Sequence, residues 1–327
     1  MFGDEKGDSW QWMPYILIIG AIVFLFWDPL GMKNTEVKYI VTNAPGPTRT
    51  PGFLVGDANA NQDGAPAAQL VGDAENSVIE GSDYPNALST GPRTSPTKTW
   101  PEVGNGTWIN VSQNADGYIF NGCVRTTRKG VRITNSEIRG DCATALLYDE
   151  GGAGVFDYNT VIDVGRQGAA ALGCGTSSRF FRNNVRGAAD GVAEGTNCQV
   201  IENYIHDLDE FLIDGSGTHN EGVAIEDPAT TGMKITKNTF ENTCGKNDLK
   251  GQGCAGVVYI ANGAAGNTVD GNYIKRWNGP NTGFLFHIVG SGINDIKNNV
   301  IECANVTGFG FANGGRSMLS NNTECIK

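Results

Sequence analysis

The chain has 327 residues, of which 39% are apolar, 18% are charged and 46 are glycine, and its formal net charge is −11. This composition excludes a coiled coil or helical bundle, and the glycine content is far below the one third of collagen. An acidic chain without a basic tract is poorly suited to neutralise phosphates, so we expect no nucleic-acid partner.

The first predicted element is a transmembrane helix at residues 14–30, which follows a short tail of residues 1–13. The stretch between Asp8 and Asp28 carries no charge. As a helix it would be roughly 28 Å long, close to a bilayer core of roughly 30 Å. Tryptophans stand at both ends, as interfacial anchors do. A cleaved signal peptide and an apolar assembly segment are the alternatives, although the tail is acidic and no Ala-x-Ala follows.

The orientation of this anchor receives two opposed signals. Lys33 and Lys38 follow the span while only Lys6 precedes it, which weakly favours a cytoplasmic C-terminal part. All eight cysteines lie between Cys123 and Cys325, and pairing of neighbours suits an oxidising compartment; buried free thiols are the alternative. We expect an extracytoplasmic C-terminal part with the pairs Cys123–Cys142, Cys174–Cys198, Cys244–Cys254 and Cys303–Cys325.

Residues 31–100 are predicted to form an extended linker. The segments 44–52, 57–64 and 89–96 are dominated by Pro, Gly, Ala, Asn, Asp, Ser and Thr, and strand-like runs are short. Such a composition cannot bury a core, so the linker would hold the next part away from a membrane.

Residues 101–327 carry a repeat whose template is apolar-x-x-Asn-x-apolar. Its matches are 156–161, 200–205, 235–240, 269–274 and 296–301, with partial matches around Asn184 and Asn322 and a serine variant at Ser136. A short β-rich unit repeated about every 23 residues is typical of a parallel β-solenoid. In such a fold the Asn would turn the chain in the left-handed backbone region and bond to the Asn of the next coil. A second motif, in which Gly opens another strand, follows most units.

The motifs in this part resemble those of right-handed parallel β-helix proteins of the pectate-lyase-like superfamily. The resemblance covers residues 116–315, and within the superfamily it is nearest to a group found in actinobacteria and their phages. The segments that carry it are 116–122, 131–139, 189–192, 204–208 and 218–224. The group typically has His-Asn-Asp-Gly in the last segment, where this chain has Glu221 in place of Asp. The resemblance implies the fold; the superfamily includes lyases, hydrolases, epimerases, tailspikes and structural stalks.

A candidate site lies where the repeat is interrupted by extra residues, which become loops on one face of a solenoid. Asp190 and Glu221 stand in the same position of successive coils, about 5 Å apart in backbone terms. One of two such close carboxyls should have a raised pKa. The pair suits glycoside hydrolysis, with His219 as a further acid or base, or a calcium ion. Solvated turn residues that cap backbone amides are the alternative.

Other candidates concern substrate binding. His206 and Asp207 begin the first insertion, and Lys275 and Arg276 follow a strand, where they would neutralise a uronate carboxylate. Tyr204 and Tyr273 come directly after the repeat Asn and are expected to face outward as part of a sugar-stacking ladder. Core packing of these aromatic rings is the alternative.

Three functions follow as expectations. The first is a membrane-anchored extracytoplasmic β-helix that recognises polysaccharide, with turnover left open among hydrolase, lyase and epimerase chemistry. The second is a phage virion component, such as a tail or spike protein, that contacts the host surface as a homotrimer or in a larger assembly. The third is a structural surface stalk without activity. The sequence matches no lyase or polygalacturonase catalytic motif.

Overall fold

The protein is described by a computed structural model, which covers residues 84–164, 170–209, 212–213, 216–217, 220–243, 254–278, 284–302, 309–313 and 317–326. These residues belong to one compact unit, residues 75–327. Every regular element in them is a β-strand. No helix in the described part is long and apolar enough to cross a bilayer, and the expected anchor at 14–30 lies outside it.

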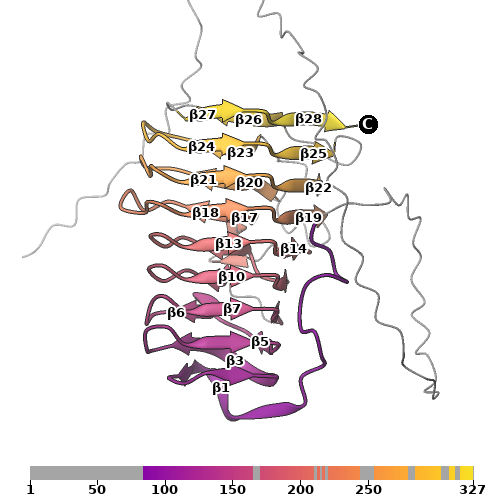
Figure 1. The fold of residues 1–327 in the computed structure, drawn as a ribbon, viewed down its shortest axis with the longest axis vertical. Coiled ribbons are helices and arrows are strands. Elements are labelled where there is room, and N and C mark those ends of the chain that lie inside the picture. The colour runs from indigo at the N-terminus through magenta and orange to yellow at the C-terminus, as the bar shows by residue number, and fades with distance from the viewer. Residues whose placement is uncertain are drawn as a thin grey trace, which may run out of the picture. The chain divides into compact units, whose positions relative to one another are not determined.

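The strands stack in parallel, coil upon coil, as a β-solenoid (Figure 1). Most coils contribute one strand to each of three sides. The first side is the 9-stranded sheet of β2 (Ala115–Asp116), β4 (Arg132–Thr134), β7 (Val155–Asp157), β10 (Arg179–Phe181), β13 (Gln199–Ile201), β18 (Lys234–Thr236), β21 (Thr268–Asp270), β24 (Asp295–Lys297) and β27 (Met318–Ser320).

The other two sides join into one 17-stranded sheet, because the long strands β1 (Lys98–Val111) and β3 (Tyr118–Thr126) run along both. The second side continues with β5 (Glu137–Gly140), β8 (Thr160–Asp163), β11 (Asn184–Arg186), β14 (Tyr204–His206), β19 (Thr239–Thr243), β22 (Tyr273–Asn278), β25 (Val300–Glu302) and β28 (Thr323–Ile326). The third side has β6 (Ala145–Asp149), β9 (Ala170–Gly173), β12 (Asp190–Ala193), β17 (Asn220–Ile225), β20 (Cys254–Ile260), β23 (Phe284–Ile288) and β26 (Phe309–Asn313).

The core is a set of apolar columns that run along the solenoid axis. Parallel strands in register place one residue of each coil directly above the equivalent residue of the last. One column is fully buried and consists of Phe156, Phe180, Val200, Ile235, Val269 and Ile296. The apolar residue that opens each repeat is therefore the inward residue of a first-side strand.

The repeat asparagines form a buried ladder, as the sequence predicts. Asn203 shows the pattern: its Oδ1 accepts from the backbone N–H and Nδ2 of Asn183, and its Nδ2 donates to the Phe180 carbonyl and to Asn238 Oδ1, all at 2.9–3.0 Å. The ladder runs from Ser136 through Asn159, Asn183, Asn203, Asn238, Asn272 and Asn299 to Asn322. Each coil is thus tied to the next by a hydrogen-bonded amide.

Two details of the predicted ladder are wrong. The third member is Asn183 and not Asn184, because Phe180 rather than Phe181 is the inward residue of β10. The left-handed conformation belongs not to the Asn but to the residue before it, for example Tyr158 (φ 57°) and Glu202 (φ 52°). The turn residue absorbs the backbone strain, which leaves the Asn side chain directed along the axis.

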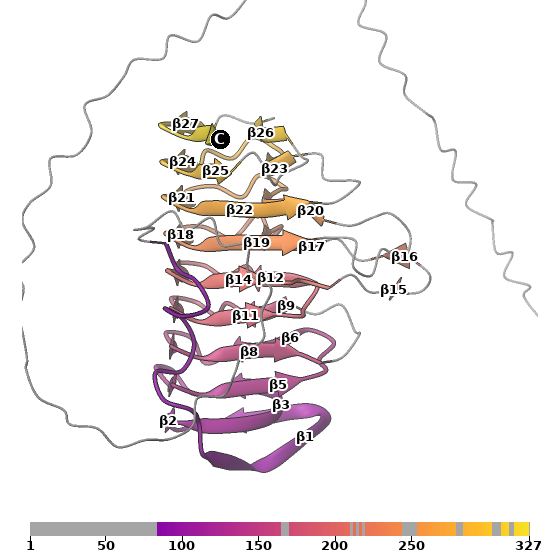
Figure 2. The same cartoon turned by 90° about the vertical axis from the view of Figure 1, so that its right-hand side faces the viewer.

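A strap, defined here as residues 84–97, runs along the outside of the solenoid toward β1 (Figure 2). Tyr84 stacks on Tyr273 of β22, with ring centroids 4.7 Å apart. Further along, the Gly91 N–H donates to the Arg182 carbonyl at 2.9 Å, and the Arg93 guanidinium lies 3.6 Å above the Tyr158 ring. This part of the expected linker therefore contacts the solenoid, and β1 begins inside that linker, at Lys98.

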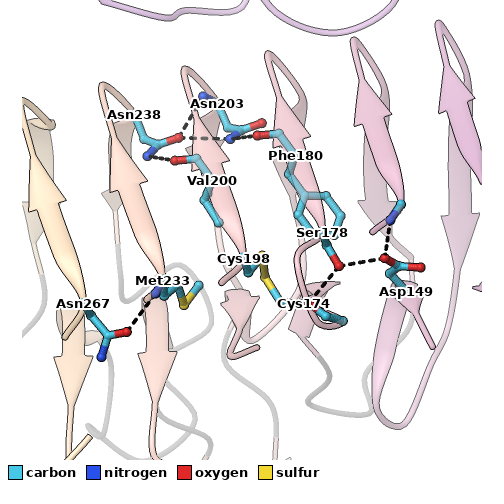
Figure 3. Close-up of a disulfide and its surroundings, with 12 residues drawn as sticks. Asp149, Cys174, Ser178, Phe180, Cys198, Val200, Asn203, Met233, Asn238 and Asn267 are labelled. Carbon is cyan, nitrogen blue, oxygen red and sulfur yellow. Dashed lines mark hydrogen bonds between the residues drawn. A yellow bond between two sulfur atoms is a disulfide. The ribbon is translucent and has the colours of Figure 1, made fainter. Parts of the chain in front are cut away.

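Two of the four predicted disulfides are confirmed. Cys123 is bonded to Cys142, and Cys174 to Cys198. Figure 3 shows the second bond beside the hydrogen bond between Asp149 and Ser178. The other two predicted pairs involve Cys244 and Cys303, which lie outside the described residues.

Candidate functional site

The carboxyl pair, Asp190 and Glu221, lies at the start of two successive third-side strands, β12 and β17. The strands pair in register, Val192 with Val223 and Ala193 with Ala224. The Glu221 backbone N–H donates to Asp190 Oδ1 at 3.0 Å, and the Glu221 side chain is buried, with 6% of the residue exposed. The repeat thus brings the two carboxyls together as expected from the sequence.

At neutral pH this pair binds one proton, whereas two ordinary surface carboxyls would bind none. Burial raises the pKa of Glu221 to about 9, and the charge of Asp190, its hydrogen bond to Glu221 and the charge of Glu226 act in the same direction. At neutral pH Glu221 is therefore a neutral acid that donates to the Asp190 carboxylate. A direct hydrogen bond brings the two carboxyls closer together than the roughly 5–9.5 Å that separates the carboxyl pairs of retaining and inverting glycosidases. The chemistry available to the pair is acid and base catalysis through a shared proton.

Asn220 anchors the chain beside this pair. Its Nδ2 donates to the Ala189 carbonyl at 3.1 Å and to the Asp209 carbonyl at 2.8 Å, which ties the two ends of the insertion to the coil before it. Its buried Oδ1 accepts no hydrogen bond within the described part of the chain. The antiparallel hairpin of β15 (Leu212–Ile213) and β16 (Ser216–Gly217) projects from this corner (Figure 2). His219, the third expected catalytic residue, lies outside the described residues.

His206 is held in place on the second side, before the same corner. Its Nδ1 lies 2.8 Å from Asp207 Oδ2 and its Nε2 lies 2.9 Å from Asn184 Oδ1. The imidazole stacks on the Tyr204 ring at 4.1 Å, with 15° between the planes. Both ring nitrogens lie within hydrogen-bond distance of a protein side chain, so the imidazole of His206 is held in one orientation on the second side.

Glu241 joins the remaining candidates into one network, named here the Glu241 network (Tyr204, Glu241, Lys275 and Arg276). The Tyr204 hydroxyl donates to Glu241 Oε2 at 2.8 Å, Lys275 Nζ lies 3.5 Å from the same oxygen, and Arg276 contacts Glu241 Oε1. Burial raises the pKa of Tyr204 to about 12, with a further rise from the charge of Asp207 and an opposing effect of Arg276. The phenol therefore stays neutral and donates.

The bulge between β19 and β22 explains how two cations reach one carboxylate. Phe240 pairs with Ile274, but Glu241 pairs with Arg276, so Lys275 is the extra residue. Sequence reasoning missed Glu241 because it is a lone acid after an apolar residue. The register places Glu241 beside Tyr204, Lys275 and Arg276. This register depends on the bulge and on the lengths of the inserted loops.

Tyr273 does not extend a ladder of rings from Tyr204. Thr239 lies between the two tyrosines in the register of the second side. The Tyr273 ring stacks on Tyr84 of the strap instead. Its pKa is raised to about 12 by burial, by the charge and hydrogen bond of Glu302, and by Tyr84. The ring face of Tyr273 that was predicted to stack on a sugar therefore packs against Tyr84 of the same chain.

For the calcium alternative, the described residues hold no cluster of three or more His, Cys, Asp or Glu side chains suited to a metal ion. Comparisons with family models, with curated proteins and with solved structures gave no match. The fold and the site therefore define this protein as a parallel β-solenoid that has a buried carboxyl pair and an outer face with polar and aromatic side chains.

Proposed function

We propose that this chain is a right-handed parallel β-helix of the pectate-lyase-like kind that recognises polysaccharide outside the cytoplasm. The observation that carries the proposal is the arrangement around one corner. The carboxyl pair begins the third side, while His206 and the Glu241 network lie on the second side of the β10, β13, β18 and β21 coils. An extended glycan has a sugar spacing near the strand spacing of about 4.8 Å, so several coils can contact it.

The chemistry of this corner supports glycan binding. Amide, carboxylate and cationic side chains lie beside one another there, and such groups are hydrogen-bond partners for the hydroxyl groups of a sugar. Asn220 Oδ1, which accepts no hydrogen bond from the described residues, adds a buried acceptor beside the carboxyl pair. The raised pKa of Glu221 beside the carboxyl group of Asp190 supports a further step, acid-base cleavage of the bound polymer.

Two features support the proposed location at the outer surface of a membrane: the apolar segment at residues 14–30 and the disulfides. Two bonded cysteine pairs are typical of an oxidising compartment. In this proposal the apolar segment anchors the protein, and the solenoid is extracytoplasmic.

The test uses the full-length protein in detergent, incubated with a panel of bacterial and plant polysaccharides, with and without calcium. Retention on each polymer and release of products are measured together. Asp190→Asn and Glu221→Gln should abolish release without loss of retention, while Tyr204→Phe should weaken retention. Glu202→Gln, which removes a partner of Arg182 at a first-side turn, is the matched control and should change neither. Absence of both retention and release across the panel would refute the proposal and leave a scaffold role.

A further inference from the structure

A second site lies in other coils from the carboxyl pair, at the corner that leads from the third side to the first. There a pocket of about 340 Å³ opens between two successive turns. One turn leads from β1 into β2, and the other leads from β3 into β4. The residues that matter for its chemistry are Ser112, Gln113, Asn114, Arg128, Lys129 and Gly130. A volume of this size is in the range of small-molecule sites.

The pocket is cationic although the protein is acidic. Arg128 and Lys129 are adjacent and exposed, and the lining contains no carboxylate. Neighbouring arginines are neutralised: Arg125 lies 3.2 Å from Glu150, and Arg132 lies 4.0 Å from Asp157. Within the described ranges, no ion pair involves Arg128 or Lys129. Two neighbouring positive charges without a counter-ion among the described residues favour an anionic ligand.

The backbone that carries these cations is fixed on both sides. The Thr127 N–H donates to the Val111 carbonyl at 3.1 Å, and the Gly130 N–H donates to the Gly152 carbonyl at 2.9 Å. Gly130 has φ +75°, which L side chains rarely adopt. A Cβ at Gly151 would lie 2.4 Å from the Arg128 carbonyl group, so the next coil packs directly on the turn. The pocket is therefore preorganised, and little ordering of backbone opposes binding.

Neutral donors complete the lining. Asn114 Oδ1 accepts from the Arg132 backbone N–H at 2.9 Å, which directs its oxygen to the protein and leaves Nδ2 as a donor. The side chains of Ser112 and Gln113 are exposed beside it. An arginine fork, a lysine point charge and neutral donors together match a tetrahedral oxyanion with two negative charges.

We propose that this pocket binds the phosphate group of a small phosphorylated ligand. The proposal is independent of glycan binding at the carboxyl pair, because it uses other residues in other coils. The same phosphomonoester chemistry is offered by a free phosphate monoester and by the headgroup of phosphatidic acid. The experiment therefore includes both sources.

Isothermal titration calorimetry on the full-length protein in a neutral detergent tests this proposal. The probes are inorganic phosphate, glycerol 3-phosphate and dihexanoyl-phosphatidic acid, with sodium acetate as the monoanion control. We expect saturable binding of at least one phosphate probe and no binding of acetate. The strongest of the three probes identifies the source of the phosphate group.

The double variant Arg128→Gln/Lys129→Gln should weaken phosphate binding at least tenfold at an unchanged thermal midpoint. Lys234→Gln, which removes an exposed cation from a first-side strand, is the matched control and should bind as the unaltered protein does. Two results would overturn the proposal: no saturable binding of any phosphate probe, or equal weakening by Lys234→Gln and the double variant.

Discussion

Cys174 is bonded to Cys198 at the positions that Asp149 and Ser178 occupy one coil earlier. The register places Cys174 above Asp149, because Tyr148 pairs with Gly173, and Cys198 above Ser178, because Arg179 pairs with Gln199. Ser178 Oγ donates to Asp149 Oδ2 at 2.7 Å, and both residues are fully buried. The same corner is therefore closed by a hydrogen bond in one coil and by a covalent bond in the next (Figure 3).

Removal of this disulfide should destabilise the solenoid. For a separation of 24 residues, loss of the restraint on the unfolded chain costs about 3 kcal/mol. We expect Cys174→Ala/Cys198→Ala to lower the free energy of unfolding by that amount in urea titrations. A reducing agent should destabilise the unaltered protein more than this variant; an equal effect on both would contradict the prediction.

The asparagine ladder should matter more in its middle than at its end. Asn203→Ala would leave the Phe180 carbonyl and the Asn183 N–H buried without partners, at a cost on the order of 3 kcal/mol. Asn322 is the last described member, and it accepts from Asn299 and donates to the Ile296 carbonyl. It is less buried, so Asn322→Ala should cost about 1 kcal/mol. Urea midpoints of the two variants compare the positions, and equal losses would refute the ladder as a continuous support.

The proton on Glu221 should make stability depend on pH. The pKa is about 9 in the folded protein and about 4.3 in an unfolded chain. The folded state therefore binds the extra proton between these values. Its stabilising effect is complete below about pH 4 and is lost as the pH rises toward 9, by up to about 1.4 kcal/mol per pH unit.

Glu221→Gln should remove this dependence, because the amide keeps a donor toward Asp190 and never ionises. Thermal midpoints measured from pH 4 to pH 9 should decline more steeply for the unaltered protein than for the variant. At pH 8.5 the variant should be the more stable of the two. Parallel profiles would show that Glu221 is ionised in the folded state at neutral pH.

Release of the strap should be detectable without unfolding of the solenoid. Tyr84→Ala removes a stacked ring pair worth about 1 kcal/mol. It also removes a group that raises the pKa of Tyr273. We expect faster proteolysis within residues 84–97 and a lower Tyr273 pKa by ultraviolet titration. Leu88→Ala is the control, since Leu88 is 98% exposed, and it should change neither.

The features that could be predicted from the sequence are those encoded within one coil. An inward apolar residue and an Asn three positions later recur in each unit, and they predicted the solenoid, its ladder and the stacking of Asp190 with Glu221. The left-handed turn residue was missed because it varies among Asn, Tyr, Arg, Glu, Lys and Gly. At Tyr158, Arg182, Glu202 and Lys237 the coil imposes this conformation, which these residue types do not favour on their own.

Contacts between coils were less predictable. Tyr204, Glu241 and Arg276 meet only because insertions of particular length and one bulge set the register of three coils. The stacking of Tyr84 on Tyr273 joins positions that no repeat relates. The low complexity of residues 84–97 gave no sign of the surface that they cover.

The course of the strap has a mechanical consequence. It contacts the β21 coil first, through Tyr84, and then earlier coils, through Gly91 and Arg93, before β1 begins. A tensile load that enters along the chain at Tyr84 is therefore borne first by the contacts of Tyr84, Gly91 and Arg93 with the solenoid, in that order. These yield one at a time, as in peeling, whereas the coils would have to shear together. The strap would therefore detach and extend under force before the load reaches the stacked coils.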